Sequence, residues 1–193
     1  MSVTEILGFV TGAAAVWLAV RENVWNWPVG IANGVFFLII FWTARLYANA
    51  LLQVIYIALG LYGWWNWLRG GSGRTPLRIR QTRVTEAVVL GALTILSAGV
   101  LIVVLDRVTD STVAFWDGAT VALSLTATYM MAAKQLHNWW VWIAADVIYI
   151  PLYAFTGLYL TSVVYVLFLA MCIVGLVQWA KALNAAEAAE SLE

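Results

Sequence analysis

Seven long apolar segments, separated by short polar joints, occupy almost the whole of this 193-residue sequence. A helix that crosses the hydrocarbon core of a membrane needs about 20 mostly apolar residues. Only 10% of the residues are charged, whereas soluble domains contain about 25%. We therefore expect an all-α integral membrane protein with seven transmembrane helices. The predicted helices cover residues 4–20, 28–44, 46–67, 85–105, 113–133, 139–155 and 160–180.

Basic residues are distributed unequally between the two sides of this predicted bundle. With seven spans, Arg45 and Arg107 fall on one side. The other basic residues fall on the opposite side: Arg21, Arg69, Arg74, Arg78, Arg80, Arg83, Lys134 and Lys181. Because basic loops remain in the cytoplasm, we expect the N-terminus outside the cell and the C-terminus inside. The basic loop at 69–83 either enforces this topology or binds anionic lipid headgroups.

A weak internal repeat relates the first three predicted helices to the last three. Residues 45–67 align with 157–179, and a one-residue slip matches 27–33 with 140–146. The slip sets Asn33 against Asp146, and Arg21 similarly matches Lys134. Because equivalent helices of the two copies lie four spans apart along the chain, both copies cross the membrane in the same direction. This predicts a 3+1+3 parallel repeat, as in the SWEET sugar carriers.

The repeat divides the sequence into four parts. Residues 1–67 are the first three-helix repeat, and 68–112 are a basic cytoplasmic loop followed by a linker helix. Residues 113–181 are the second three-helix repeat. Residues 182–193 form a cytoplasmic tail, which we expect to be disordered.

Asp146 lies near the middle of an almost wholly apolar segment. At helical spacing Trp139, Trp142, Asp146 and Tyr149 fall on one face of this segment. An ionised carboxylate at the centre of a membrane helix costs about 2.5–3.5 kcal/mol on insertion scales, so such residues usually face a bundle interior or a cavity. Aromatic faces beside a carboxylate suit a flat or cationic solute. The pattern predicts a transport site.

Amide and hydroxyl side chains form a second candidate wall of this site. Asn49, Gln53 and Tyr56 share one face of segment 46–67, and Asn33 lies in the preceding segment. Asn and Gln both donate and accept hydrogen bonds, which suits an amide or a ribose hydroxyl. The alternative is interhelical hydrogen bonding, which contributes less than about 1 kcal/mol per bond in membranes. Cys172 lies in an apolar run and is interpreted as a packing residue.

This sequence lacks the residues that several other classes of protein require. A net charge of zero argues against a nucleic-acid partner. A retinal-binding photoreceptor needs a lysine within its last helix, but Lys181 lies past the end of the last span. The only histidine, His137, lies at an interface, and the sequence has no HExxH motif, cysteine pair or nucleophile elbow. We therefore expect no enzymatic activity, cofactor or metal.

Two segments resemble the signature segments of the PnuC family of vitamin transporters: LYANALLQVIYIALGLYGWWNW (46–67) and NWWVWIAAD (138–146). Members of that family carry an LYA…LLQ…YGWW pattern in the third core helix and WxxWxxx(N/D) in the sixth. Here the second pattern is Trp139, Trp142 and Asp146. WDGATVALS (116–124) and GLYLTSVVY (157–165) extend the resemblance over essentially the whole chain.

The resemblance implies a SWEET-like fold, a homotrimer and a location in the bacterial inner membrane. It also implies facilitated diffusion (uniport) of nicotinamide riboside, with metabolic trapping through phosphorylation by a cytoplasmic kinase. The pyridinium ring of that substrate is cationic and planar, which suits aromatic faces and the carboxylate of Asp146. The ribose needs hydrogen-bond partners such as Gln53 and Asn33.

Two departures from the family pattern leave the substrate open. Nicotinamide riboside carriers often have Asn where this chain has Asp146, and Glu where it has His137. Thiamine is also cationic and aromatic and fits Asp146 equally, whereas neutral riboflavin gains little from the carboxylate. A proton-coupled vitamin carrier and a ligand sensor without transport are further alternatives.

Overall fold

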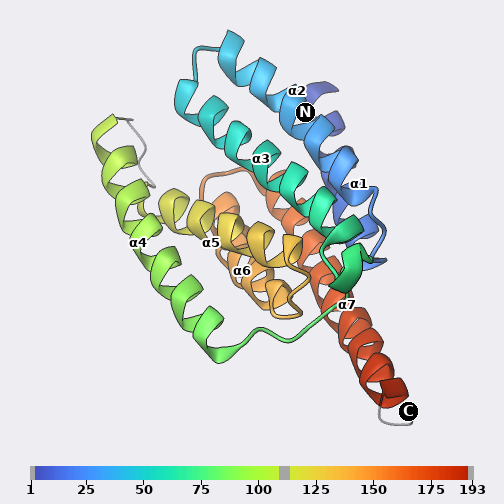
Figure 1. Cartoon of the computed structure of the whole chain (residues 1–193). Coiled ribbons are helices and arrows are strands. Elements are labelled where there is room, and N and C mark those ends of the chain that lie inside the picture. The colour runs from blue at the N-terminus through green and yellow to red at the C-terminus, as the bar shows by residue number, and fades with distance from the viewer. Residues whose placement is uncertain (1–2, 109–113, 191–193) are drawn as a thin grey trace.

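Seven α-helices, joined by short turns and one longer linker, make up the computed structural model of the chain, which describes residues 3–108 and 114–190 (Figure 1). The helices are α1 (Val3–Val20), α2 (Asn26–Thr43), α3 (Tyr47–Arg69), α4 (Val84–Val108), α5 (Ala114–Ala132), α6 (Asn138–Phe155) and α7 (Tyr159–Glu190). A 3-10 turn, Ser72–Arg74, lies between α3 and α4. The all-α class is confirmed, and each predicted span corresponds to one of these helices.

Helix α7 continues beyond the end of the last predicted span. It remains helical to Glu190. The prediction of a disordered tail is therefore wrong for residues 182–190. The stretch consists mostly of alanine and glutamate, which are strong helix formers. Leu183 within it is buried in the core, which holds the extension against the rest of the protein. Residues 191–193 lie outside the described part.

The distribution of side chains is that of a multi-pass membrane protein. Among the described helices, α2, α3, α4 and α7 are long and apolar enough to cross a membrane by length and composition alone. Helices α5 and α6 carry polar residues within their apolar sequences, and Thr120, Ser124 and Asp146 among them are buried inside the bundle. Large apolar side chains face outwards instead, such as Ile95 of α4, which is 76% exposed. Polar groups in membrane proteins face the interior in this way.

The helices pack in two matching sets. Helix α2 packs against α1 and α3, which we call the first half, and α6 packs against α5 and α7, the second half. The halves meet where α1 contacts α7 and where α3 contacts α5. Helix α4 packs against α5 at the side of the bundle (Figure 1).

Contacts of the first half recur in the second half at a spacing of 112 residues. Trp27 meets Trp67 edge-on, with ring centroids 5.6 Å apart and planes at 88°. Trp139 meets Trp179 in the same way, at 5.4 Å and 87°. The agreement extends to the backbone under Trp27 and Trp139, which are called the inner tryptophans of the two pairs.

A glycine lies under the inner tryptophan of each pair. A Cβ at Gly63 would lie 2.5 Å from the ring of Trp27, and one at Gly175 would lie 2.6 Å from the ring of Trp139. Real Cβ atoms do not approach a ring this closely, so both positions require glycine for the same reason.

The constant spacing corrects the alignment drawn from the sequence. Trp27 corresponds to Trp139 and not to Trp140, which is exposed. The one-residue slip is therefore wrong, and Asn33 is not the counterpart of Asp146. Two adjacent tryptophans made the register ambiguous, because only the packing distinguishes the ring that faces inwards.

The turns that follow α1 and α5 match at the same spacing. Glu22 has φ 52° and Lys134 has φ 45°. The Glu22 N–H donates to the Ala19 carbonyl, and the Lys134 N–H donates to the Met131 carbonyl, both at 3.0 Å. Lys134 therefore corresponds to Glu22 rather than to Arg21.

The linker between α3 and α4 folds back across one end of the bundle. The Arg80 N–H donates to the Lys134 carbonyl at 3.0 Å, and the Leu136 N–H donates to the Arg80 carbonyl at 2.9 Å. Ile79 is buried in the same cluster as Leu183. We call this end, which holds residues 21–25, 70–83 and 133–137, the linker end.

Candidate functional site

A cavity of about 410 Å³ lies between the two halves. This volume is within the range of small-molecule sites, about 300–1,000 Å³. Both halves contribute to its wall. The lining residues are Gly12, Ala15, Val16, Ala19, Asn26, Trp27, Gly30, Ile31, Asn33, Gly34, Gln53, Tyr56, Gly60, Ser124, Thr128, Met131, Trp139, Trp142, Asp146, Tyr149, Tyr165, Phe168 and Cys172.

Seven of the eight predicted binding residues line this one cavity. They are Trp142, Asp146, Tyr149, Gln53, Asn33, Trp139 and Tyr56. The eighth, Asn49, is exposed near the start of α3 and lies outside the lining set. Helical spacing placed Asn49 on the face of Gln53, but the cavity wall on α3 begins at Gln53. The role of all eight in ligand binding stays a prediction.

The carboxyl group of Asp146 is buried in the middle of α6, with the residue 3% exposed. The Cys172 thiol on α7 donates a hydrogen bond to its Oδ2 at 3.5 Å. The lining contains no Lys, Arg or His, and no ion pair to Asp146 is formed within residues 3–108 and 114–190. An uncompensated buried carboxylate is costly, so a cationic ligand would supply the missing partner. Because it donates this hydrogen bond, Cys172 contacts the carboxyl group of Asp146 in addition to packing in the core.

The two amide side chains of the opposite wall have different surroundings. Asn33 Nδ2 donates to Thr11 Oγ1 at 2.7 Å and to the Gly8 carbonyl at 3.2 Å. Its donors are thus directed at α1, and its oxygen is the atom left for a ligand. Gln53 Oε1 lies 3.7 Å from where a Cβ at Gly34 would be. The missing side chain of Gly34 leaves room beside this amide.

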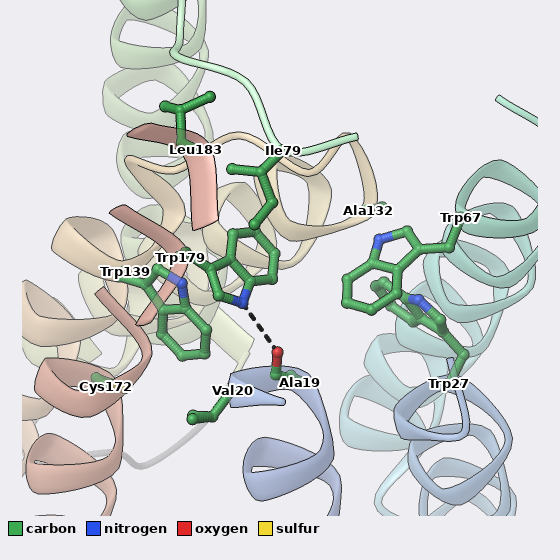
Figure 2. Packing of buried hydrophobic residues seen from close by; sticks show 10 residues of the cluster. All are labelled: Ala19, Val20, Trp27, Trp67, Ile79, Ala132, Trp139, Cys172, Trp179 and Leu183. Atoms are coloured by element: carbon green, nitrogen blue, oxygen red, sulfur yellow. Dashed lines mark hydrogen bonds between the residues drawn. The ribbon is translucent and has the colours of Figure 1, made fainter. Parts of the chain in front are cut away.

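Four tryptophans form a layer at the linker end of the cavity (Figure 2). They are Trp27, Trp67, Trp139 and Trp179, each at most 6% exposed. We call this group the tryptophan layer. Trp27 and Trp139 also line the cavity, so the layer forms its floor.

Two indoles of this layer bind the opposite half. Trp67 Nε1 of α3 donates to the Met131 carbonyl of α5 at 2.9 Å. Trp179 Nε1 of α7 donates to the Ala19 carbonyl of α1 at 3.1 Å, the bond drawn in Figure 2. These bonds are equivalent at the 112-residue spacing. The two halves therefore hold each other reciprocally.

Four buried N–H donors of lining residues have no acceptor in the described part of the chain. They are Nδ2 of Asn26 and Nε1 of Trp27, Trp139 and Trp142. An unpaired buried donor costs about 1–3 kcal/mol. A ligand with acceptor oxygens would lower this cost.

Helix α7 adds two aromatic residues to the wall that hydropathy and spacing did not single out. The Tyr165 ring centroid lies 4.6 Å from that of Tyr149 and 5.2 Å from that of Tyr153. Phe168 packs edge-on against Tyr165. With Cys172, these residues lie on one helical face of α7. The same search for polar and aromatic residues on one helical face, applied to the last predicted span, would have indicated Tyr165 and Phe168.

An apolar exterior and a polar–aromatic cavity between two matching halves define a multi-pass membrane protein with a site for a small solute. Residues 2–181 match the family described as nicotinamide mononucleotide transporter. The chain belongs to this family, and the resemblance to PnuC proteins is confirmed.

Similar proteins cover nearly the whole chain. The nicotinamide riboside transporter PnuC of Escherichia coli (strain K12) is 28% identical over 93% of this chain and 85% of its own length. The riboflavin/roseoflavin transporter RibM of Streptomyces davaonensis is 25% identical over 91% and 84%. A crystal structure of the vitamin B3 transporter PnuC aligns with a TM-score of 0.69 and 22% identity, covering 93% of this chain and 81% of that one. The last match shows a common fold.

Proposed function

We propose that the protein carries nicotinamide riboside across the membrane by facilitated diffusion, as a uniporter. The observation that carries this proposal is the buried Asp146 carboxyl group, which lies in an aromatic cavity without a basic partner among the lining residues. A planar pyridinium cation supplies the opposite charge and stacks on aromatic faces. The naming of the Escherichia coli relative as a nicotinamide riboside transporter supports this substrate.

The polar groups of the cavity suit the rest of this substrate. The carboxamide and ribose oxygens can accept hydrogen bonds from unpaired donors such as Trp142 Nε1 and Asn26 Nδ2. The ribose hydroxyls can donate to Asn33 Oδ1 and to Gln53. Trp142, Tyr149 and Tyr56 provide aromatic surface around the ring.

Two other vitamins are the principal alternatives. The RibM relative favours riboflavin, but a neutral ring would leave the Asp146 carboxyl group uncompensated. Thiamine is cationic and satisfies Asp146 as well as nicotinamide riboside does. A proton-coupled carrier is a third alternative, because a carboxyl group in the middle of a membrane helix can carry a proton.

We infer a 3+1+3 parallel repeat of SWEET type, in which the halves alternate around a fixed central site. The matched tryptophan pairs, glycines and turns at a spacing of 112 residues support it. The cavity lies between the halves, where such repeats place their substrate. The linker end gathers most of the basic residues, so we place it in the cytoplasm of a bacterial inner membrane.

Net uptake in this proposal depends on metabolism rather than on a gradient. A cytoplasmic kinase phosphorylates the carried riboside, and the added charge prevents its return. The protein itself performs no chemistry. We further propose that three copies assemble as a homotrimer in contact with membrane lipid.

A binding titration tests the substrate. The twelve tryptophans serve as a fluorescence reporter, and the ligands are nicotinamide riboside, thiamine, riboflavin and nicotinamide mononucleotide. Saturable quenching by nicotinamide riboside alone is expected. Saturation by thiamine or riboflavin instead assigns the protein to another branch of the family and refutes our substrate.

Counterflow in proteoliposomes tests the mechanism. Exchange of labelled nicotinamide riboside should continue at the same rate after an ionophore dissipates the proton gradient. A rate that falls with the gradient would indicate proton coupling. Binding without any exchange would indicate a sensor.

A further inference from the structure

The linker end of the bundle carries an ion pair between equivalent residues of the two halves. Lys134 Nζ of the α5–α6 turn lies 3.1 Å from Glu22 Oε2 of the α1–α2 turn. The Lys134 side chain is 9% exposed and that of Glu22 is 33% exposed. The pair thus joins the halves directly below the cavity floor.

Lys134 also contacts the tryptophan layer. Its Nζ lies 4.6 Å from the centroid of the Trp67 ring, in a cation–π contact. Trp67 in turn donates to the carbonyl of Met131, three residues before Lys134. Lys134 of the α5–α6 turn therefore contacts both α3, through Trp67, and the α1–α2 turn, through Glu22.

The contacts between the halves at this end are numerous and polar. Besides the ion pair they include the bonds from Trp67 to Met131 and from Trp179 to Ala19. Asn66 Nδ2 adds a bond to the Ala132 carbonyl at 2.9 Å. A solute can pass this end only if the halves separate, and separation breaks all of these contacts together.

We propose that the Glu22–Lys134 pair is the latch that keeps the cavity closed at the linker end. The opening of the cavity at this end is called the mouth, and the ion pair must break each time the mouth opens. The reciprocal tryptophan bonds close the mouth symmetrically, and the ion pair adds a charge-dependent term to the closed state. A buried lysine that loses its carboxylate is left uncompensated. Opening the mouth hydrates the ammonium group, so removing Glu22 favours the open state.

The different exposures of the two partners predict unequal effects. Glu22→Gln leaves a nearly buried ammonium group without its partner, whereas Lys134→Met leaves a carboxylate that is already one-third exposed. Glu22→Gln should therefore open the mouth more than Lys134→Met. The methionine also retains the apolar packing of the lysine stem.

The single cysteine of the chain supplies the measurement. Cys172 lines the cavity and is 4% exposed, so a membrane-impermeant maleimide reaches it only through an open mouth. Labelling is compared in right-side-out and inside-out membrane vesicles, whose orientation is scored by trypsin cleavage in the 70–83 linker. The labelling experiment needs no vitamin. A negative result would therefore refute the latch without bearing on whether the protein transports nicotinamide riboside.

We expect Glu22→Gln to raise the rate of Cys172 labelling about tenfold from the linker side and to leave it unchanged from the other side. The double exchange Glu22→Lys with Lys134→Glu should lower the rate again. The matched control is Glu86→Gln, because Glu86 is equally exposed and pairs with Arg80 of the linker at 2.7 Å, in an ion pair that does not join the two halves. Its labelling should equal that of the unmodified chain.

Three results would overturn the latch. One is an unchanged labelling rate in a folded Glu22→Gln protein, and a second is an equal rise in Glu86→Gln. The third is a charge exchange that labels as fast as Glu22→Gln. If Glu22→Gln does not fold, Lys134→Met carries the same test with a smaller expected rise.

Discussion

Replacing Asp146 by asparagine should remove the preference for a cationic ring while keeping the shape of the cavity. The two side chains are nearly isosteric, and the Cys172 thiol can still donate to the amide oxygen at the position of Oδ2. The substitution therefore isolates the charge. At an effective dielectric constant of about 20, two unit charges about 5 Å apart interact by roughly 3 kcal/mol. After losses to solvation we expect about 2–3 kcal/mol, a 30- to 150-fold change in Kd.

The assay compares two ligands that differ in ring charge. Nicotinamide riboside carries a pyridinium cation, and its reduced dihydro form keeps the carboxamide and ribose but is neutral. Tryptophan quenching gives the two Kd values for the unmodified chain and for Asp146→Asn. The unmodified chain should prefer the cation, and Asp146→Asn should bind the two forms about equally.

The matched control is Cys172→Ser, which keeps a hydrogen-bond donor beside Asp146 and leaves the carboxyl group in place. Its ratio of the two Kd values should resemble that of the unmodified chain. The electrostatic reasoning is refuted if Asp146→Asn lowers both affinities equally, because the carboxyl group would then act through hydrogen bonding or folding alone.

Three further substitutions test the site and the fold. Trp142→Ala should weaken nicotinamide riboside binding by about 1–3 kcal/mol through lost stacking, whereas Trp140→Ala, at an exposed position, should leave the Kd unchanged in the same titration. Asn49→Ala should also leave the Kd unchanged, because Asn49 lies outside the cavity lining; a several-fold loss would restore it to the site. Gly175→Ala should destabilise the protein by about 1–3 kcal/mol through overpacking against the tryptophan layer, seen as a lower Tm in detergent. Gly99→Ala, which has open space around the new methyl group, should not lower the Tm; equal values for both alanine variants would contradict the packing argument.

Hydropathy located the helices because the physical signal is strong at every span. A membrane segment must be apolar over about 20 residues and must satisfy its backbone hydrogen bonds internally. The same rule made Asp146 conspicuous, since an isolated carboxyl group in such a segment needs a reason to be there. This cost indicated that Asp146 faces a cavity, and helical spacing placed Trp139, Trp142 and Tyr149 beside it in the wall.

Details that depend on contact between distant segments were beyond the reach of these patterns. Trp139 and Trp140 are identical in the sequence, and only packing against Gly175 distinguishes them. Ile79 lies in a polar, basic stretch and gave no sign that it joins the core. The ion pair between Glu22 and Lys134 joins residues that lie 112 positions apart. Lys134 was counted among the basic residues of one side and matched with Arg21, and Glu22 was not singled out.

The length of α7 has a practical consequence for imaging this small protein. Its 32 residues span about 48 Å at roughly 1.5 Å per residue, which exceeds the hydrocarbon thickness of about 30 Å. The surplus projects as a continuous rod anchored at its base by Leu183. A folded domain joined to this rod in unbroken helical register would turn with α7 as one rigid body. Such a fiducial would add particle mass outside the micelle and would report any tilt of α7 directly.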